Sequence, residues 1–145
     1  MIPRIGERVR TGQGYSRRPG AYAVLLRGRD VLLTHQDAPE PEFQLPGGGV
    51  DPGEHPIAAL HREVWEETGW KMALTRRLGA FRRFTYMPEY DLWAEKVCTV
   101  YLGRAVRRLG PPVEAGHTAH LVPLPLAAEM VGNDGDRMFL RRLPG

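Results

Sequence analysis

Short apolar runs separated by turn residues occupy the first third of the chain. Ala21 to Leu26 and Val31 to His35 are such runs, and Gly28 to Asp30 lies between them, which is the pattern of a β-hairpin. Phe43 to Leu45 follows as a short extended segment. Pro46 to Gly49 contains a proline and three glycines, so we expect it to interrupt regular structure.

The next segment, Pro56 to Thr68, has the periodicity of an amphipathic helix. Ile57, Leu60 and Val64 form an apolar stripe at i, i+3 and i+7. The segment begins with a proline, whose missing N–H is tolerated in a first helical turn. Gly69 follows it, and glycine is favoured at a helix C-terminus. The pattern therefore predicts a helix over residues 56–68.

The second half of the chain alternates between strand and helix patterns. We predict longer strands over Met72 to Thr85 and Trp93 to Val106 and a short strand over His120 to Val122. Pro125 to Val131 and Asp136 to Leu143 have the pattern of short helices. Strands, one helix, strands and further helices in this order predict an α+β fold, a mixed sheet with helices packed on it.

Length and composition fit one globular domain over residues 1–145. Hydrophobic residues make up 42% and charged residues 26%. Residues 1–19 are polar, basic and rich in turn residues, so we expect an irregular N-terminal arm. No apolar run resembles a signal peptide or a membrane span, and we expect a cytoplasmic protein without a membrane partner. The single cysteine, Cys98, excludes an internal disulfide and is interpreted as a small buried hydrophobe.

The net charge of +3 is mild, but arginines occur in pairs. The pairs are Arg17-Arg18, Arg76-Arg77, Arg82-Arg83, Arg107-Arg108 and Arg141-Arg142. Two interpretations stay open, a solvated surface or contact with an anionic substrate. A nucleic-acid surface would require the pairs to cluster in space. We therefore do not predict an obligatory nucleic-acid partner.

Three carboxylates define the candidate chemistry. Glu63, Glu66 and Glu67 lie at i, i+3 and i+4 and so share one face of the predicted helix. Their mutual repulsion and their place near the helix C-terminus, where the macrodipole disfavours anions, are both unfavourable without a compensating cation. Oxygen ligands suit Mg²⁺ or Mn²⁺. Taken alone, the same three residues are also typical of a solvated helix face.

The whole segment 48–70, GGVDPGEHPIAALHREVWEETGW, resembles the Nudix box. The box residues stand in register at Gly48, Glu54, Arg62, Glu63, Val64, Glu66, Glu67 and Gly69. The one departure is Trp70, where the family prefers an aliphatic residue. Trp70 is large and apolar, so we interpret it as a packing variant.

The resemblance implies a fold, an activity and a set of roles. The fold would be the Nudix α/β/α sandwich. The activity would be Mg²⁺-dependent hydrolysis, with Mn²⁺ as a substitute, of the diphosphate linkage that joins a nucleoside diphosphate to another group. Glu63, Glu66, Glu67 and a main-chain carbonyl near Gly48 would hold the metal, and one glutamate would be the general base. Arg62 would orient a carboxylate of this set, and Glu54 would fix the loop or the metal's surroundings.

Residues outside the box complete the candidate site. Family members often use one more group from a later loop, and Glu114 is our first candidate there, with His117 and His120 as alternatives. Arg82, Tyr86 and Glu114 are our candidates for substrate binding.

The substrate stays open among dinucleoside polyphosphates, modified nucleoside triphosphates and ADP-ribose. Tyr86 and Pro88 stand 16 and 18 residues beyond Trp70, where family members specific for the first and the last of these tend to carry a tyrosine or a proline. Phe81 and Phe84 are expected in the core, whereas Tyr86 and Tyr90 are equally suited to the core or the site.

Two other functions compete with hydrolysis. A catalytically silent Nudix module that binds nucleotides or regulates would usually lack box glutamates, and this chain has all of them. An isomerase acting on a prenyl diphosphate would need a well-placed cysteine, and Cys98 lies in the middle of a predicted strand. The expected partner is a small nucleoside diphosphate derivative. The family often forms dimers, so a homodimer is a further expectation.

Overall fold

The computed structural model describes residues 1–144, in which seven strands form one mixed sheet. The strands are β1 (Ser16–Arg27), β2 (Asp30–Gln36), β3 (Glu42–Gln44), β4 (Gly47–Gly49), β5 (Trp70–Met87), β6 (Leu92–Arg108) and β7 (His117–Pro123). Their order is β3-β2-β1-β6-β5, with β4 paired to β1 and β7 paired to β2. The β1–β6 pair is parallel and the other pairs are antiparallel.

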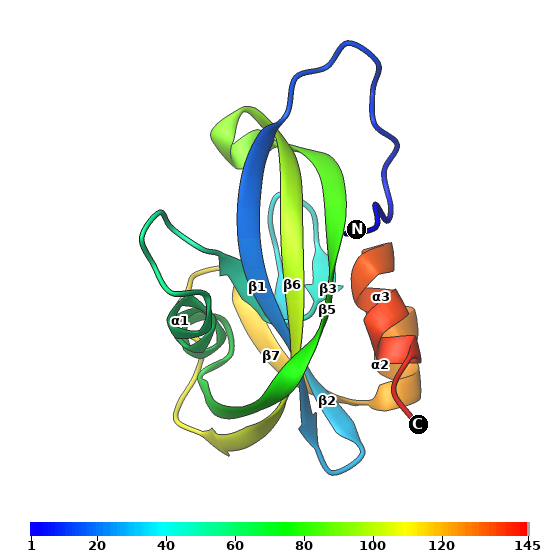
Figure 1. The fold of residues 1–145 in the computed structure, drawn as a ribbon. Helices are drawn as coiled ribbons and strands as arrows, with labels where there is room; N and C mark the ends of the chain where they lie inside the picture. The colour runs from blue at the N-terminus through cyan, green and yellow to red at the C-terminus, as the bar shows by residue number, and fades with distance from the viewer. Residues whose placement is uncertain (145) are drawn as a thin grey trace.

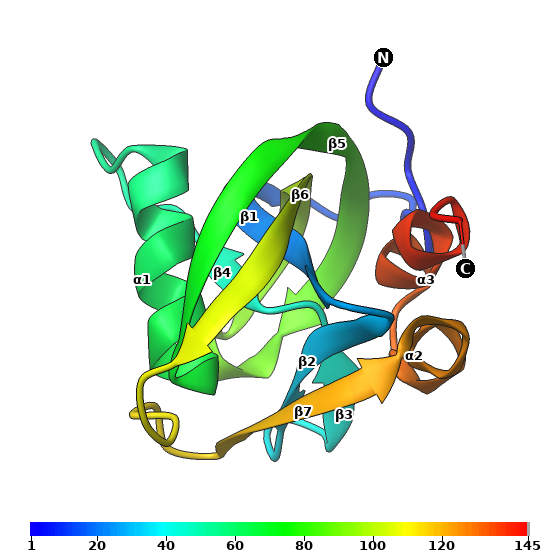
Figure 2. The same cartoon turned by 90° about the horizontal axis from the view of Figure 1, so that it is seen from below.

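Helices cover the sheet on opposite sides. Helix α1 (Pro56–Thr68) lies on one side, and α2 (Leu124–Met130) and α3 (Asp134–Arg141) lie on the other (Figures 1 and 2). A 3-10 turn, η1 (Pro88–Tyr90), joins β5 to β6. Each helical layer encloses its own buried apolar cluster against the sheet. The predicted α+β sandwich is therefore confirmed.

Helix α1 begins and ends where the sequence predicts. His55 is the N-cap residue, and its Nδ1 accepts a hydrogen bond of 3.2 Å from the N–H of Ile57. Gly69 adopts the left-handed conformation with a φ of 74°. Leu60 and Val64 are fully buried. The expectation for Ile57 is wrong, because this side chain is 38% exposed in the first turn, before the helix reaches the sheet.

The irregular N-terminal arm ends at residue 15, so the expected arm of residues 1–19 is too long. Strand β1 begins at Ser16, and Ser16 to Pro19 pair in parallel with Ala94 to Val97 of β6. The polar residues of this segment gave no strand pattern, because their pairing partner lies almost eighty residues away. Residues 1–15 contain no regular element, but Arg4 pairs with Arg82 at the outer edge of β5.

Contrary to our expectation, the glycine segment forms a strand instead of interrupting regular structure. Gly47 to Gly49 form β4 and pair with Gly20 to Tyr22 of β1. A Cβ at Gly47 would lie 2.2 Å from the carbonyl oxygen of Ala21, so only glycine allows the two backbones to come this close. The close approach places β4 directly beside the helix that follows it.

The remaining boundaries differ from the predictions by a few residues. Strand β7 begins at His117 instead of His120, because it pairs along the whole of β2. Helix α3 begins at Asp134 instead of Asp136, because Asn133 caps it by accepting a hydrogen bond of 2.8 Å from the N–H of Asp136. Among the described residues, no helix has the length and apolarity that crossing a membrane would require.

Candidate active site

The acidic face of α1 packs against β4. Glu67 is only 6% exposed, and its Oε1 accepts a hydrogen bond of 2.9 Å from the N–H of Gly47. Glu63, one helical turn before Glu67, and Glu66, the residue directly before it, are half-buried. The buried stripe of Leu60 and Val64 faces the sheet and fixes the rotation of the helix, so the carboxylates lie at the edge of the core.

Gly48 leaves room for the carboxylate of Glu63. A Cβ at Gly48 would lie 2.7 Å from Cδ and 2.8 Å from Oε2 of Glu63. No heavy atom lies within 4 Å of the same position at Gly49. The helix therefore presents its carboxylate directly to the backbone of β4, and Gly48 is the position at which a side chain would displace it.

Arg62 connects the carboxylates. Its Nε and Nη2 donate to the two carboxylate oxygens of Glu54, each at 3.1 Å. Its Nη1 donates to Oε1 of Glu63 at 3.1 Å and reaches Glu66 at 3.5 Å. Glu54 also accepts a hydrogen bond from the N–H of Asp51, so it fixes the loop before the helix. One planar guanidinium thus orients the loop and the acidic face together.

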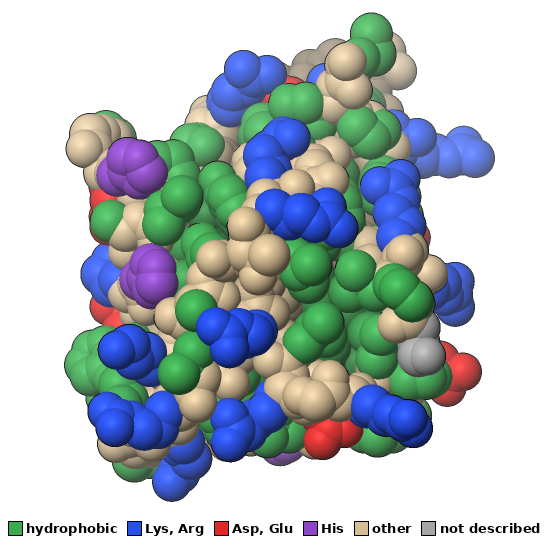
Figure 3. Space-filling model, turned by 60° about the horizontal axis from the view of Figure 1, so that its bottom comes forward, with side chains coloured by type: hydrophobic (Ala, Val, Ile, Leu, Met, Phe, Trp, Pro, Cys, Tyr) green, Lys and Arg blue, Asp and Glu red, His purple; other side chains and the backbone are tan. Residues whose placement is uncertain are grey.

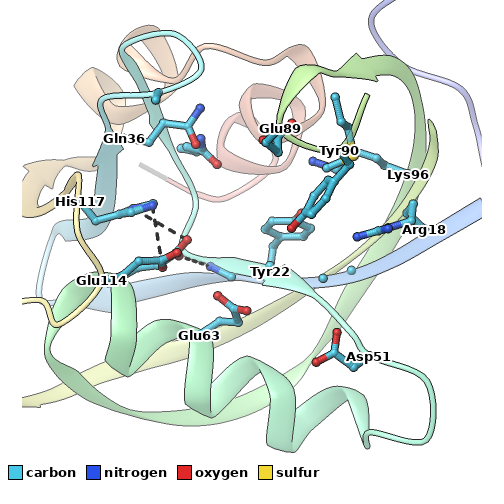
Figure 4. A pocket seen from close by; sticks show the side chains of 18 of the residues that line it. Arg18, Tyr22, Gln36, Asp51, Glu63, Glu89, Tyr90, Lys96, Glu114 and His117 are labelled. Carbon is cyan, nitrogen blue, oxygen red and sulfur yellow. Dashed lines mark hydrogen bonds and ion pairs between the residues drawn. The ribbon is translucent and has the colours of Figure 1, made fainter. Parts of the chain in front are cut away.

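The loop before β7 and the first residue of β7 bring two further groups to the carboxylates. The N–H groups of Val113 and Glu114 both donate to the carbonyl of Glu66, which holds this loop on the last turn of α1. His117 Nδ1 lies 3.8 Å from Oε2 of Glu67, and its Nε2 lies 3.8 Å from Oε2 of Glu114 (Figure 4). His120 instead contacts Thr118, outside the cavity. Of the three candidates Glu114, His117 and His120, the first two therefore reach the site.

The clustered carboxylates are electrostatically strained. Burial raises the pKa of Glu63 to about 7, and the neighbouring Glu114 and Glu66 act in the same direction, against Arg62. Burial also raises the pKa of Glu67 well above its usual range, with Glu63 and Glu114 adding to the shift. By contrast, the hydrogen bond from Arg62 lowers the pKa of Glu54. A cation between the helix and the loop would relieve this repulsion.

The donor set fits a hard divalent cation. Glu63, Glu66 and Glu114 bring one oxygen each within 4.8 Å of one another, and Glu67, Glu114 and His117 form a second such group. All donors but one are carboxylate oxygens, which Mg²⁺ and Mn²⁺ accept.

The carboxylates line one wall of a cavity of about 430 Å³. The opposite wall carries Arg18 from β1, Lys96 from β6 and Tyr90 from η1, and Figure 4 shows these side chains across the cavity from Glu63 and Glu114. The amides of Gln36 and Gln44 line its far end. An acidic wall thus faces a wall of two cations and an aromatic ring, which also carries Glu89 of η1, across a space of the size of a small ligand.

Sequence reasoning missed most of the second wall. Arg18 and Lys96 are register partners on the parallel strands β1 and β6, and nothing in the sequence indicates this pairing. Arg18 belongs to one of the arginine pairs, and its guanidinium lies 4.8 Å from the ring centre of Tyr90. Lys96 carried no local signal at all.

Of the three residues expected to bind substrate, Glu114 lines the cavity, whereas Arg82 and Tyr86 lie elsewhere. Arg82 does not line the cavity; it donates to the carbonyl of Ile2 and to Glu95, because its strand is covered by the N-terminal arm. Tyr86 lines an adjoining hollow, and its hydroxyl donates to Asp91. Cys98 is buried in the core, where desolvation raises the pKa of its thiol to about 11, so it does not supply the cysteine that an isomerase would need.

Solved structures share this architecture. A MutT NUDIX hydrolase from Burkholderia pseudomallei is 25% identical, with a TM-score of 0.67 over 89% of this chain and 99% of that chain. The MutT protein from Methanosarcina mazei Go1 is 22% identical, with a TM-score of 0.71 over 90% of this chain and 95% of that chain. A sheet between helical layers, with a glutamate helix packed on a glycine strand, therefore defines a protein of the Nudix fold.

The chain belongs to the NUDIX domain family, whose profile matches residues 16–143. A putative 8-oxo-dGTP diphosphatase from Bacillus subtilis is 36% identical over 51% of this chain and 50% of that protein. An RNA pyrophosphohydrolase from Cereibacter sphaeroides is 44% identical over 36% of this chain and 33% of that protein. The alignments thus span half or less of these curated relatives.

Proposed function

We propose that this protein is a Mg²⁺-dependent hydrolase that cleaves the diphosphate linkage of a nucleoside diphosphate derivative. The observation that carries the proposal is the meeting of Glu63, Glu67 and Glu114 on one wall of a cavity whose other wall holds Arg18 and Lys96. The acidic wall suits a divalent cation, and the basic wall suits the phosphates of a substrate. Both relatives described above carry names of enzymes that cleave such linkages.

The metal would be held by Glu63, Glu66 and Glu67, with the carbonyl at Gly48, and by Glu114 from the neighbouring loop. When bound, Mg²⁺ screens phosphate charge and makes a coordinated water a better nucleophile. Mn²⁺ has the same preference for oxygen ligands and would serve as a substitute.

The other residues would position the reacting groups. Arg62 keeps Glu63 and Glu66 in place while it anchors the loop through Glu54. Gly47 holds one oxygen of Glu67, which leaves the other free to face the cavity, and a carboxylate of the helix accepts the proton of the attacking water. Arg18 and Lys96 would bind the phosphates of the substrate, and Tyr90 offers a ring on which a nucleobase can stack. Positioning and charge stabilisation account for most of the rate in phosphoryl transfer of this kind.

The proposal is tested by phosphate and nucleotide release from a panel of anhydrides in the presence of Mg²⁺. The panel contains 8-oxo-dGTP, ADP-ribose, dinucleoside polyphosphates and an RNA with a 5′-triphosphate. We expect hydrolysis of at least one class, lost on removal of the metal with a chelator. A protein that binds Mn²⁺ at the site but cleaves no member of the panel would support the silent binding module instead.

Glu67→Gln is the sharpest single variant. It removes the charge of the most buried carboxylate in the site yet keeps an oxygen to accept the hydrogen bond from Gly47. We expect kcat to fall by about 10²- to 10⁴-fold with an unchanged thermal midpoint. Glu129→Gln, on the exposed side of α2, is the matched control and should leave kcat unchanged. Near-normal turnover of Glu67→Gln would remove Glu67 from the mechanism.

A further inference from the structure

Two long stretches of the chain contain no acidic residue. No Asp or Glu occurs in residues 68–88 or 96–113, although both stretches are rich in arginine. They make up most of β5 and β6, which pair along nearly their full lengths. The two acid-free segments therefore form one two-stranded ribbon, and the positive charges on its half remote from η1 have no acidic neighbour in β5 or β6.

Six cations gather on the half of this ribbon that is remote from η1. We call them the basic ribbon: Lys71, Arg76, Arg77, Arg104, Arg107 and Arg108. Lys71 pairs with Arg107, and Arg104 pairs with Ala73, so the two strands contribute cations side by side. All six side chains are exposed. The structure thus brings together two arginine pairs, 76–77 and 107–108, that are separate in the sequence.

None of these six residues forms a salt bridge to any group in residues 1–144. Other arginines do, with Arg62, Arg82 and Arg83 bound to glutamates. Because the protein carries a formal charge of +3, six positive charges on the ribbon leave −3 for the rest of the chain. Figure 3, which turns the remote end of the ribbon toward the viewer, shows Lys and Arg spread over this face with few Asp or Glu among them.

The spread of the cations indicates a polyanion as the partner. At about 3.3 Å per residue, Arg104 and Arg108 alone span about 13 Å. A single small anion would need converging side chains, whereas a line of separate cations matches successive phosphates of a nucleic-acid backbone. Charge complementarity along the ribbon therefore favours a phosphodiester chain.

A short loop joins the basic ribbon to the wall of the cavity. Residues 109–113 connect Arg108 to Glu114, and this loop is held on α1 by hydrogen bonds from Leu109 to Gly69 and from Val113 to Glu66. Only five residues separate Arg108 from Glu114, whose carboxylate lines the cavity. A chain whose 5′ phosphates lie in the cavity can thus continue past this loop onto the ribbon.

We propose that the basic ribbon binds the sugar–phosphate backbone of single-stranded RNA whose 5′-polyphosphate end occupies the cavity. RNA is the fitting polymer because a chain begun from a nucleoside triphosphate retains a phosphoanhydride at its 5′ end. The placement of that end rests on the proposed function, whereas binding of the backbone by the ribbon does not.

The test measures binding in the Glu67→Gln background, so turnover plays no part. The probe is a fluorescent 20-nucleotide single-stranded RNA with a 5′-triphosphate, followed by anisotropy from 50 to 200 mM salt. The ribbon variant Arg104→Ala/Arg107→Ala/Arg108→Ala is compared with Arg8→Ala/Arg141→Ala/Arg142→Ala, which removes the same charge from the N-terminal arm and the end of α3. A 5′-triphosphorylated dinucleotide serves as the short probe.

We expect the ribbon variant to bind the long RNA at least tenfold more weakly than the parent. The slope of log K against log salt should fall by about 2, since each lost phosphate contact contributes about 0.7 for a single strand. The short probe should bind the ribbon variant as tightly as it binds the parent. The affinity of the control variant for the long RNA should fall by less than twofold. The proposal would be overturned if the two triple variants lost the same affinity for the long RNA. It would also be overturned if the ribbon variant lost as much affinity for the short probe as for the long RNA.

Two further results separate this inference from its alternatives. Ribbon-dependent binding to vesicles of anionic phospholipid, with none to RNA, would make the ribbon a membrane surface and overturn the proposal. Absence of hydrolysis across the whole anhydride panel would refute the proposed function, while the anisotropy result would still decide whether the ribbon binds RNA.

Discussion

Single glycines decide how closely the acidic helix approaches the sheet. Gly47 brings β4 against β1, and Gly48 leaves space for the carboxylate of Glu63. A Cβ at Gly47 would collide with the backbone of β1, whereas a Cβ at Gly48 would collide with the carboxylate of Glu63. The arrangement of the site thus depends on missing side chains as much as on the carboxylates themselves.

Gly48→Ala tests this dependence directly. The new methyl group would displace the carboxylate of Glu63, so we expect Mn²⁺ affinity to fall at least tenfold with the fold retained. The affinity can be measured by titration calorimetry or by electron paramagnetic resonance. Gly49→Ala is the matched control, because its Cβ would meet no atom within 4 Å. Equal Mn²⁺ affinity of the two variants would contradict the role assigned to Gly48.

At the scale of elements, α1 is held at both ends by local chemistry. His55 and Pro56 begin it, and Gly69 ends it in a left-handed conformation that lets β5 start at once. The carbonyl of Gly69 also accepts the N–H of Leu109, so the end of the helix is joined to the loop that leads to Glu114. The helix terminus therefore helps to place the later loop of the site.

Gly69→Ala should lower the free energy of unfolding by about 3 kcal/mol. A Cβ there would combine left-handed backbone strain, about 1–2 kcal/mol, with a contact of 2.0 Å to the carbonyl oxygen of Gly110. Gly53→Ala shares the positive φ but meets no atom within 4 Å, so it should lose only about 1 kcal/mol. Urea unfolding measures both. A loss no larger at Gly69 than at Gly53 would show that the loop yields to the methyl group.

At the scale of the whole molecule, a buried carboxylate joins the C-terminal helices to the sheet. Asp136 of α3 is 3% exposed and accepts a hydrogen bond of 3.1 Å from the N–H of Leu45, between β3 and β4. Burial raises the pKa of Asp136 to about 6, although the hydrogen bond from Leu45 and the charges of Arg83 and Lys96 oppose the shift. The native state therefore holds this proton more tightly than the unfolded chain does.

This shift predicts a pH dependence of stability. Between about pH 4 and pH 6 the unfolded chain has released the proton and the native state has not, so the contribution of Asp136 to the free energy of unfolding falls as pH rises. The contribution is then constant above about pH 6. Asp136→Asn should remove up to about 3 kcal/mol of this dependence.

The measurement is urea unfolding of Asp136→Asn and the parent protein from pH 4 to pH 7.5. The control is Asp134→Asn, an exposed carboxylate in the same helical turn. The difference in the free energy of unfolding between Asp136→Asn and the parent should change between pH 4 and pH 6. The same difference between Asp134→Asn and the parent should stay nearly constant. A flat difference for both variants would mean that Asp136 stays ionised in the native state throughout.

Local sequence patterns predict the helices and strands better than they predict which of these elements are in contact. The helix over residues 56–68 follows from its apolar stripe, its first proline and its final glycine, all of which act within a few residues. Strand β1 extends beyond its prediction because Ser16 to Pro19 pair with a strand that is distant in the sequence. The expectation that Arg82 binds substrate is wrong for the same reason, since its partner Ile2 belongs to the N-terminal arm, which is distant in the sequence.

The helix, the spacing of its three glutamates and the family resemblance can be inferred from the chain alone, because they depend on fixed spacing along one element. The folded molecule was needed to show that Glu114 and His117 reach those glutamates, that Arg18 and Lys96 face them, and that two arginine pairs lie on one ribbon. Strand pairing and loop placement depend on contacts between residues far apart in the chain. Such contacts minimise the free energy of the whole molecule and leave no mark in any short stretch of sequence.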